Sequence, residues 1–379
     1  MTSERFVFAM LVVPMVVATA GAQRPLAIRL KRANAVHPTG FSGIARLREL
    51  SDGRLIVLDS TDHKLYLVNF GTGTAAPFGR VGDGPEEYRR PNGLFALPGD
   101  TTMVTDAQTR RLIFFRGDRP AATLSAEAPV MKATDGFIIG TSQAGYIAKA
   151  FLPRGLGRPV DQGDSILIAR FSRADGRGDT LARMRSGFGG PPGSATKATP
   201  AFERAAGPTA QREYMFAPVI GDQAIGFPDG WIAVARMEPY RVDWIDPAGK
   251  MHRGRPIPVP VTPLDDKEKR FYLERLAKLD GKPAGNPADI KDWRPAIPPF
   301  WGFYDAALHQ APGGNLLVTR APTAALPTPT YDFVERSGAY LGQLVLPAGQ
   351  AVVGFGAHSV YVVVVDADGL ESLRRHPWP

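Results

Sequence analysis

The chain has 379 residues, of which 41 are glycine, 35 are proline and none is cysteine, and its formal net charge is +8. Glycine and proline make up about a fifth of the chain against roughly 12% in an average protein, which excludes a helical bundle, while 44% hydrophobic residues exclude a disordered chain. The missing cysteines exclude disulfides, thiolate zinc sites and a cysteine nucleophile. Apolar segments cut by frequent glycine and proline predict an all-β protein of short strands.

Residues 1–22 have the layout of a secretory signal peptide. Arg5 provides the positive start, residues 6–18 form an apolar run, and the small residues 20–22 predict cleavage after Ala22. The run is shorter than the roughly 20 residues of a membrane span, although an uncleaved N-terminal anchor is the alternative. We therefore expect a periplasmic or secreted bacterial protein, with a mature chain of residues 23–379 and no stable membrane span after cleavage.

Downstream, one plan recurs: a turn with Gly or Asp, an apolar strand, a polar turn and a second apolar strand. The clearest copies lie at residues 52–68 and 102–115. Copies start near residues 54, 102, 145, 231, 315 and 360, at intervals of 48, 43, 86, 84 and 45. A four-stranded propeller blade takes roughly 40–50 residues, so the spacing predicts a β-propeller with four-stranded antiparallel blades.

The two doubled intervals could hide two missed blades or hold insertions. The first contains a Gly/Pro-rich stretch at about 185–214 without a strand pair. The second, at about 253–300, contains a helix signature: Thr262 as N-cap, Pro263 at the first position and apolar residues recurring from Tyr272. Both intervals therefore indicate insertions, and the sequence predicts six blades in one domain with one inserted helix.

The last repeat predicts how the ring closes. After the strand at 359–366 only one further strand, at about 370–376, precedes the end of the chain. Residues 26–31 look like a strand with no local partner. We expect this N-terminal strand to complete the last blade and remove its exposed edge; a frayed arm is the alternative.

The segment between the first two repeats carries a family resemblance. Residues 78–93, FGRVGDGPEEYRRPNG, resemble the connector of NHL-type six-bladed propellers. The following pattern from Asp106 through Arg111 to Phe115 resembles the NHL blade signature, and Asp59 begins a looser copy. The likeness spans roughly residues 50–118. It implies the fold and a general binding role of diverged exported bacterial propellers, but no reaction.

Candidate binding residues come from this connector and from the aromatic insertion. Propeller connectors border the central opening, and aromatic side chains over one mouth of the ring could present flat faces to a sugar or a peptide. Packing of the insertion is the alternative for its aromatic residues. The candidates for ligand binding are Arg80, Tyr88, Arg89, Arg90, Trp301 and Tyr304.

Two acidic residues recur at the same position of the repeat, which favours a structural role for them over a catalytic one. Asp59 and Asp106 stand at a strand's end before a tight turn, where a carboxylate can accept backbone N–H bonds. No nucleophile elbow, histidine pair or local acidic metal loop occurs, so no catalytic residue, metal ligand or cofactor is assigned. The alternative is a calcium site on the central axis, formed by carboxylates from several blades.

These observations predict an exported ligand-binding or protein-interaction module rather than an enzyme. The alternative is a metal-dependent propeller hydrolase or lactonase that uses axial carboxylates. The positive charge, largely from arginine, favours an anionic small molecule, glycan or protein as partner, although a genome rich in arginine codons would give the same composition. Nucleic acid is disfavoured because no concentrated basic run occurs, and we expect a monomer.

Overall fold

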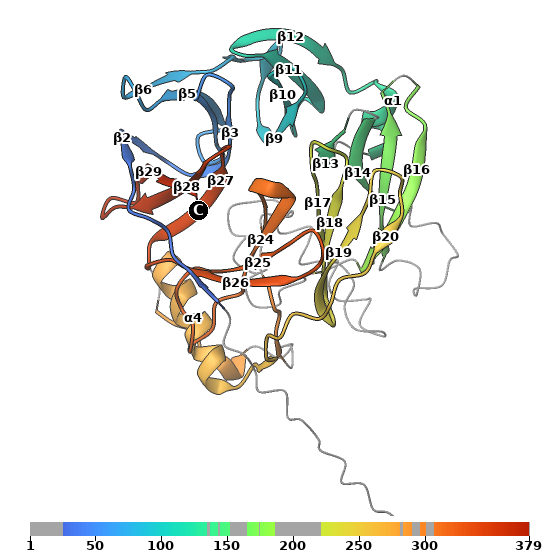
Figure 1. The fold of residues 1–379 in the computed structure, drawn as a ribbon. Coiled ribbons are helices and arrows are strands. Elements are labelled where there is room, and N and C mark those ends of the chain that lie inside the picture. The colour runs from blue at the N-terminus through green and yellow to red at the C-terminus, as the bar shows by residue number, and fades with distance from the viewer. Residues whose placement is uncertain are drawn as a thin grey trace, which may run out of the picture.

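The computed structural model describes residues 26–134, 137–142, 145–151, 165–173, 175–185, 221–280, 283–289, 296–300 and 307–378. Six β-sheets stand around one axis, as the view along that axis in Figure 1 shows. The prediction of a six-bladed propeller with four-stranded antiparallel blades is therefore confirmed.

The blades, each given from the inner to the outer strand, follow one another in chain order. Blade 1 holds β3 (Ile44–Glu49), β4 (Leu55–Asp59), β5 (Lys64–Asn69) and β6 (Thr74–Pro77); blade 2 holds β9 (Pro91–Leu97), β10 (Thr101–Asp106), β11 (Arg111–Arg116) and β12 (Arg119–Leu124); blade 3 holds β13 (Ile138–Thr141), β14 (Gly145–Phe151), β15 (Ser165–Ser172) and β16 (Gly178–Arg185). Blade 4 holds β17 (Gln223–Gly226), β18 (Ile232–Met237), β19 (Tyr240–Ile245) and β20 (Met251–His252); blade 5 holds β23 (Leu308–Ala311), β24 (Asn315–Thr319), β25 (Thr330–Val334) and β26 (Tyr340–Val345); blade 6 holds β27 (Gln350–Phe355), β28 (Ser359–Val365), β29 (Glu371–Pro377) and, outermost, β2 (Ala35–Phe41).

The core consists of apolar clusters between neighbouring blades. In β4, Leu55 and Val57 pack toward blade 6, whereas Ile56 and Leu58 pack toward blade 2. Successive side chains of a strand point to opposite faces, so a strand with a blade on either side must be apolar at every position. All four side chains are fully buried, and each such burial contributes about 1.5–3 kcal/mol.

The N-terminal segment closes the ring, but the closing strand is not the one that the sequence indicated. β2 pairs with β29 antiparallel, with Ala35 opposite Arg375 and Phe41 opposite Glu371. Pro38 and Gly40 hid this strand from sequence reasoning; both are tolerated because β2 is an edge strand whose ladder is interrupted between Val36 and Gly40. Completion of the last blade by an N-terminal strand is confirmed, and its assignment to residues 26–31 is wrong.

Residues 26–31 instead brace the joint between the last two blades. Within them, β1 (Ala27–Ile28) pairs in parallel with β26 and gives blade 5 a fifth strand. Ile28 and Leu30 pack against the apolar cluster between blades 5 and 6. His376 Nδ1 lies 2.8 Å from the carbonyl oxygen of Lys31, which ties the segment to the third strand of blade 6.

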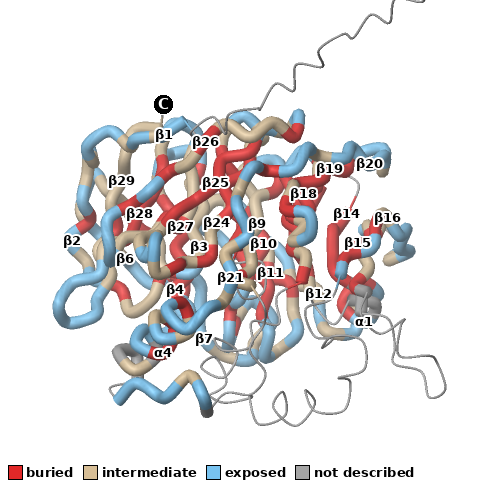
Figure 2. Tube along the Cα trace, turned by 90° about the horizontal axis from the view of Figure 1, so that it is seen from below, coloured by how far each residue is buried: buried red, intermediate tan, exposed pale blue. Residues whose placement is uncertain are grey.

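The helices and short strands lie in the connections. Figure 2 shows α1 (Pro129–Thr134), α4 (Asp266–Asp280) and β7 (Arg80–Val81) along one rim of the ring, with the C-terminus at the other rim. We call the rim with these elements the connector face. The remaining short elements are β8 (Glu87–Tyr88), which pairs with β7; β21 (Thr262–Pro263), which pairs with β22 (Ala296–Ile297); and the 3-10 turns η2 (Pro287–Asp289) and η3 (Pro312–Gly314).

The inserted helix α4 is present, and its N-terminus lies three residues beyond the predicted cap. Asp265 Oδ1 accepts the backbone N–H of Glu268 at 2.9 Å, so Asp265 rather than Thr262 caps the helix. Thr262 belongs to β21, and this pairing delays the start of the helix. Tyr272 donates its hydroxyl proton to the carbonyl oxygen of Pro322 at 2.6 Å, which fastens α4 beneath blade 5.

Ring closure gives a first prediction, tested with two truncations of a chain that starts at residue 23. Removal of residues 23–34 deletes β1 but leaves β2, so we expect a native ring whose melting temperature falls by a few degrees. Removal of residues 23–41 also deletes β2, exposes the edge of β29 and removes the buried Phe41 side chain. We expect this second variant to aggregate or to lose cooperative melting by circular dichroism; equal melting of both variants would contradict the role of β2.

Candidate functional site

All six inner strands start at the connector face and end at the far face, and they surround the axis of the ring (Figure 1). Near the far ends of the strands, polar side chains are used to join blades. Arg48 donates to Thr102 and pairs with Asp100 at 3.3 Å, Thr141 donates to the carbonyl oxygen of Ala96 at 3.0 Å, and Gln310 donates to that of Gly226 at 2.5 Å. At this end of the axis, these polar side chains therefore join neighbouring blades.

The inner strands carry very few acidic groups. Among their residues Glu49 is the single carboxylate, and it accepts a hydrogen bond from the Tyr361 hydroxyl at 3.0 Å. The basic residues of the same strands are Arg46, Arg48 and His309, and Arg48 is paired with Asp100. Besides this pair, the strands carry the opposite charges of Arg46, near the start of β3, and Glu49, at its end.

Polar residues gather at the connector ends of the inner strands. Each lies within the first three residues of a different inner strand, so that five blades contribute one residue each. All five side chains can donate hydrogen bonds, and none is acidic. We call these residues the axial polar set: Arg46, Asn92, Gln223, His309 and Gln350.

Solvent reaches much of the axial polar set. Asn92 is exposed, and Arg46, His309 and Gln350 are half-buried, whereas Gln223 is buried. The Thr105 hydroxyl donates to Asn92 Oδ1 at 2.7 Å and so orients the amide. Exposure of several donors at one end of the axis makes this end the candidate binding site.

His309 is an ionisable member of this set, and its pKa departs from the ordinary value. Its Nε2 lies 3.3 Å from Thr319 Oγ1, and its ring meets the Tyr331 ring edge-on at 6.0 Å. Burial among the surrounding blades, followed by the positive charge of Arg46, lowers the pKa of His309 to about 4. The ring is therefore neutral at pH 7, although part of it remains in contact with solvent.

The predicted binding residues of the connector differ in whether a ligand could reach them. Tyr88 is 2% exposed; its hydroxyl accepts the N–H of Leu65 at 3.0 Å and donates to the carbonyl oxygen of Phe78 at 3.1 Å. It therefore packs the joint between blades 1 and 2 and does not face a ligand, which corrects its proposed binding role. Aromatic residues in a polar connector can equally be anchors, and the sequence pattern does not distinguish the two.

The three connector arginines lie at the surface of the connector face. Arg80 pairs with Glu87 at 3.5 Å, and Arg89 pairs with Asp83 at 2.5 Å. Arg90 is exposed and lies directly before β9. The candidates Trp301 and Tyr304 lie outside the described residues.

The two repeated aspartates make the same contacts in their blades. Asp59 Oδ1 accepts the N–H groups of Thr61 and Asp62, and its Oδ2 accepts those of Ser42 and Gly43. Each carboxylate thus joins the turn after its own strand to the chain that enters the inner strand.

In blade 2, Asp106 accepts four N–H groups in the same way: from Gln108 and Thr109 through Oδ1, and from Arg89 and Arg90 through Oδ2. The two Oδ2 contacts measure 2.6 and 2.8 Å, so the backbone that carries the connector arginines is fixed next to the inner strand β9.

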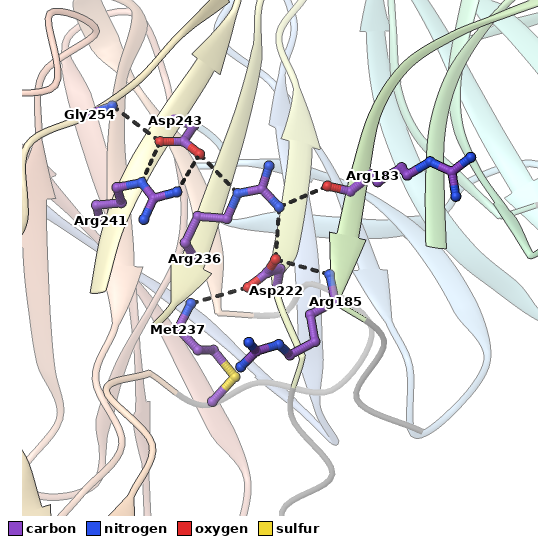
Figure 3. A network of polar contacts seen from close by, with 8 residues as sticks. All are labelled: Arg183, Arg185, Asp222, Arg236, Met237, Arg241, Asp243 and Gly254. Carbon is purple, nitrogen blue, oxygen red and sulfur yellow. Dashed lines mark hydrogen bonds and ion pairs between the residues drawn. The ribbon is translucent and has the colours of Figure 1, made fainter. Parts of the chain in front are cut away.

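A second set of polar contacts joins blades 3 and 4 at the connector face (Figure 3). Arg236 pairs with Asp222 at 2.8 Å and with Asp243 at 2.9 Å, and Arg241 pairs with Asp243 at 2.8 Å. Burial alone would raise the pKa of Asp243, but the bonds from the two arginines outweigh it and hold that pKa below its usual value.

The same network fixes the two ends of the long connection between blades 3 and 4. Arg185 donates its N–H to Asp222 Oδ2 at 3.0 Å, and Asp222 donates its own N–H to the carbonyl oxygen of Arg185 at 3.1 Å. The charges of this network are paired with one another, so it stabilises the joint and adds no charge to the axis.

The described inner strands offer few ligands for a metal ion. Calcium takes six to eight oxygen ligands, several of them carboxylates. The inner strands offer only Glu49, and in the described parts of the chain no three His, Cys, Asp or Glu side chains lie close enough together to hold an ion. The axial carboxylates of the alternative enzyme hypothesis are therefore missing from these strands.

Sequence reasoning missed Arg46, Asn92 and His309. The repeat pattern is carried by the second strand of each blade, and the inner strands, which are shorter in four of the six blades, hold more polar residues. The members of the axial polar set stand six to ten positions before the repeat starts, at offsets that differ from blade to blade, so alignment of the repeats does not bring them together.

Comparison with known proteins assigns no family to the chain. No family model matches the chain, no curated protein matches its sequence, and the NHL resemblance is thus without support from either. Solved structures that match include a protein from Bacteroides fragilis classed as exported (10% identity, 93% of this chain and 94% of the other, TM-score 0.48), virginiamycin B lyase from Staphylococcus aureus (11%, 90% and 83%, 0.39) and a gluconolactonase from Xanthomonas campestris (10%, 95% and 99%, 0.43). Within the described residues no helix is long and apolar enough to cross a membrane.

The aspartate contacts give a second prediction. In Asp106→Asn an amide NH₂ would face backbone N–H donors, so we expect a loss of about 1–3 kcal/mol in the free energy of unfolding. The control is Asp118→Asn, because Asp118 forms an exposed pair with Arg54, and such a pair is worth about 0–1 kcal/mol. Chemical denaturation measures both; equal stability of the two variants would show that the Asp106 carboxylate does not hold the connector.

Proposed function

We propose that this protein is an exported ligand-binding propeller that holds an anionic ligand at the connector end of its axis. The observation that carries the proposal is the composition of the inner strands, in which the one carboxylate, Glu49, stands at the far end of β3 while Arg46 and uncharged donors stand near the connector ends. Export rests on the signal-peptide layout of residues 1–22.

Arg46 is the main candidate for contact with the ligand. A guanidinium offers a planar fork of N–H donors that matches the two oxygens of a carboxylate, phosphate or sulfate group. Asn92 and Gln350 would add neutral donors beside it. Exposed arginines of the connector face, Arg80 and Arg90, would attract an anion toward this end through their longer-range field.

The chemistry of the site favours binding over metal-dependent hydrolysis. Hydrolysis of a lactone by an axial metal needs several oxygen ligands, and the inner strands bring donors of hydrogen bonds instead. The partner that fits these donors is a small molecule or glycan with an oxyanion group.

The test compares two charge-removing variants. We expect sodium sulfate and sodium D-glucuronate to bind the wild-type protein in isothermal titration, D-glucose to bind far more weakly, and Arg46→Met to weaken anion binding at least about tenfold. Arg119→Met is the control, because it removes the same charge from the exposed outer strand of blade 2. Lack of binding of both anions, or equal affinity in Arg46→Met and wild type, would overturn the proposal.

A further inference from the structure

A basic segment of the chain crosses the outer edge of the joint between blades 5 and 6. β1 pairs with β26 of blade 5, and β2 is the outermost strand of blade 6, so residues 29–34 pass from one blade to the other. Figure 2 shows β1 and the C-terminus at the rim opposite the connector face. This surface is therefore separate from the candidate binding site at the connector end of the axis.

Hydrogen bonds from blade 6 fix the backbone of this crossing. His376 Nδ1 lies 2.8 Å from the carbonyl oxygen of Lys31. Asn34 donates its N–H to the carbonyl oxygen of Arg375 at 2.9 Å, and Asn34 Oδ1 accepts a bond from Arg375 Nε at 3.0 Å. Because these contacts use the backbone of the segment and the Asn34 amide, the basic side chains of the segment remain available to a partner.

The basic side chains of the crossing point outward. Ile28 and Leu30 pack against the apolar cluster between blades 5 and 6. Arg29 and Lys31 alternate with them and are exposed, and Arg32 is exposed as well. Since successive side chains of an extended segment point to opposite sides, burial of the apolar pair places Arg29 and Lys31 on the solvent side.

An arginine of β29 extends this basic surface. Arg374 is paired with Val362 of β28 and with Val36 of β2, and Val362 belongs to the apolar cluster between blades 5 and 6. Paired residues share one face of a sheet, so Arg374 lies on the side of blade 6 that faces blade 5. It is half-buried, and its Nε has no hydrogen-bond partner among the described residues, so a nearby negative charge would stabilise it. We call these four residues the outer basic patch: Arg29, Lys31, Arg32 and Arg374.

Negative charge is scarce around the outer basic patch. None of its side chains forms an ion pair with a described residue. Residues 26–48 and 372–378 contain no Asp or Glu, and neither do β26 and β28. The acidic residues between 366 and 371 lie at the connector end of blade 6, and Glu335 lies in the turn after β25. The patch is therefore a local surplus of positive charge.

Exposed aliphatic side chains accompany these charges. Leu26, at the start of the segment, is 72% exposed, and Val36, opposite Arg374, is 57% exposed. A soluble polyanion would gain little from contact with them, whereas the headgroup region of a bilayer accepts both cations and apolar side chains. The combination therefore favours a lipid surface over a nucleic acid or a charged glycan.

We propose that the outer basic patch, together with Leu26 and Val36, docks the propeller on a bilayer surface that contains anionic phospholipid. The protein lies on this surface and does not span it. Attraction between the cations and the headgroups acts within about one Debye length, roughly 8–10 Å at physiological salt. The docking surface is distinct from the proposed anion site at the connector end, so neither depends on the other.

Cosedimentation with vesicles tests the docking, with a chain that starts at residue 23 so that the apolar run of residues 6–18 does not contribute. We expect binding to phosphatidylcholine vesicles that contain about one-third phosphatidylglycerol at about 50 mM NaCl, much weaker binding to pure phosphatidylcholine, and release at about 500 mM NaCl. The triple variant Arg29→Gln, Lys31→Gln, Arg32→Gln should lower the vesicle partition coefficient at least about tenfold. Its melting temperature should stay within about 2 °C of the wild type, because all three side chains are exposed.

Two controls separate the patch from net charge and from general surface apolarity. The triple variant Arg116→Gln, Arg119→Gln, Arg253→Gln removes the same number of exposed charges from blades 2 and 4, and its partition coefficient should stay within about twofold of the wild type. Leu26→Ser should weaken vesicle binding several-fold. Val261→Ser removes a side chain that is 77% exposed before β21 and should leave binding unchanged.

The contrary outcomes are as distinct. Absence of salt-sensitive binding to the anionic vesicles overturns the docking, and equal loss in the two triple variants shows that net charge alone attracts the protein. A loss in Arg46→Met as large as in the patch variant places vesicle binding at the axis instead. Binding of polygalacturonate or DNA through the patch, without binding to anionic vesicles, assigns the patch to a soluble polyanion. Titration of the same chain with sulfate and glucuronate tests the proposed function separately.

Discussion

Burial on both faces of every middle strand is the constraint from which the architecture follows. Leu55 and Val57 of β4 need one neighbouring blade, and Ile56 and Leu58 need another. The same division recurs in β18, where Ile232 and Val234 pack against blade 3 and the alternating alanines pack against blade 5. A row of such sheets leaves two apolar faces exposed unless it closes, so closure by β2 is an energetic necessity of these strands.

Closure also decides what the polar residues of the inner strands can do. Near the far face, Arg48, Thr141 and Gln310 form hydrogen bonds to neighbouring blades, and these bonds help to hold the ring together. Near the connector face, the strands begin after connections of different length, and four of the five polar side chains there are exposed or half-buried. The two ends of the six inner strands thus have different roles, although both ends belong to the same six strands.

The sequence predicted features set by local pattern and missed those set by the neighbours of a residue. Repeat spacing predicted six blades because each blade is one hairpin-rich unit of similar length, and the helical signature predicted α4 because an apolar stripe is a local property. The strand β2 was missed because Pro38 and Gly40 contradict strand propensity and only its edge position tolerates them. Tyr88 was given a binding role because nothing local tells that its hydroxyl spans Leu65 and Phe78.

The candidate site was harder to predict than the fold, because its residues share a place on the axis and no motif. Arg46 and His309 stand far apart in the sequence, and blade 6, assembled from both ends of the chain, lies between their blades in the closed ring. Burial is the first cause of the lowered pKa of His309, and the positive charge of Arg46, from another blade, adds to it. In a ring of repeated units, a residue of one blade can thus be influenced by charges that its own repeat does not contain. Polar and charged residues that differ between repeats are found in the inner strands, because the middle strands must be apolar on both faces.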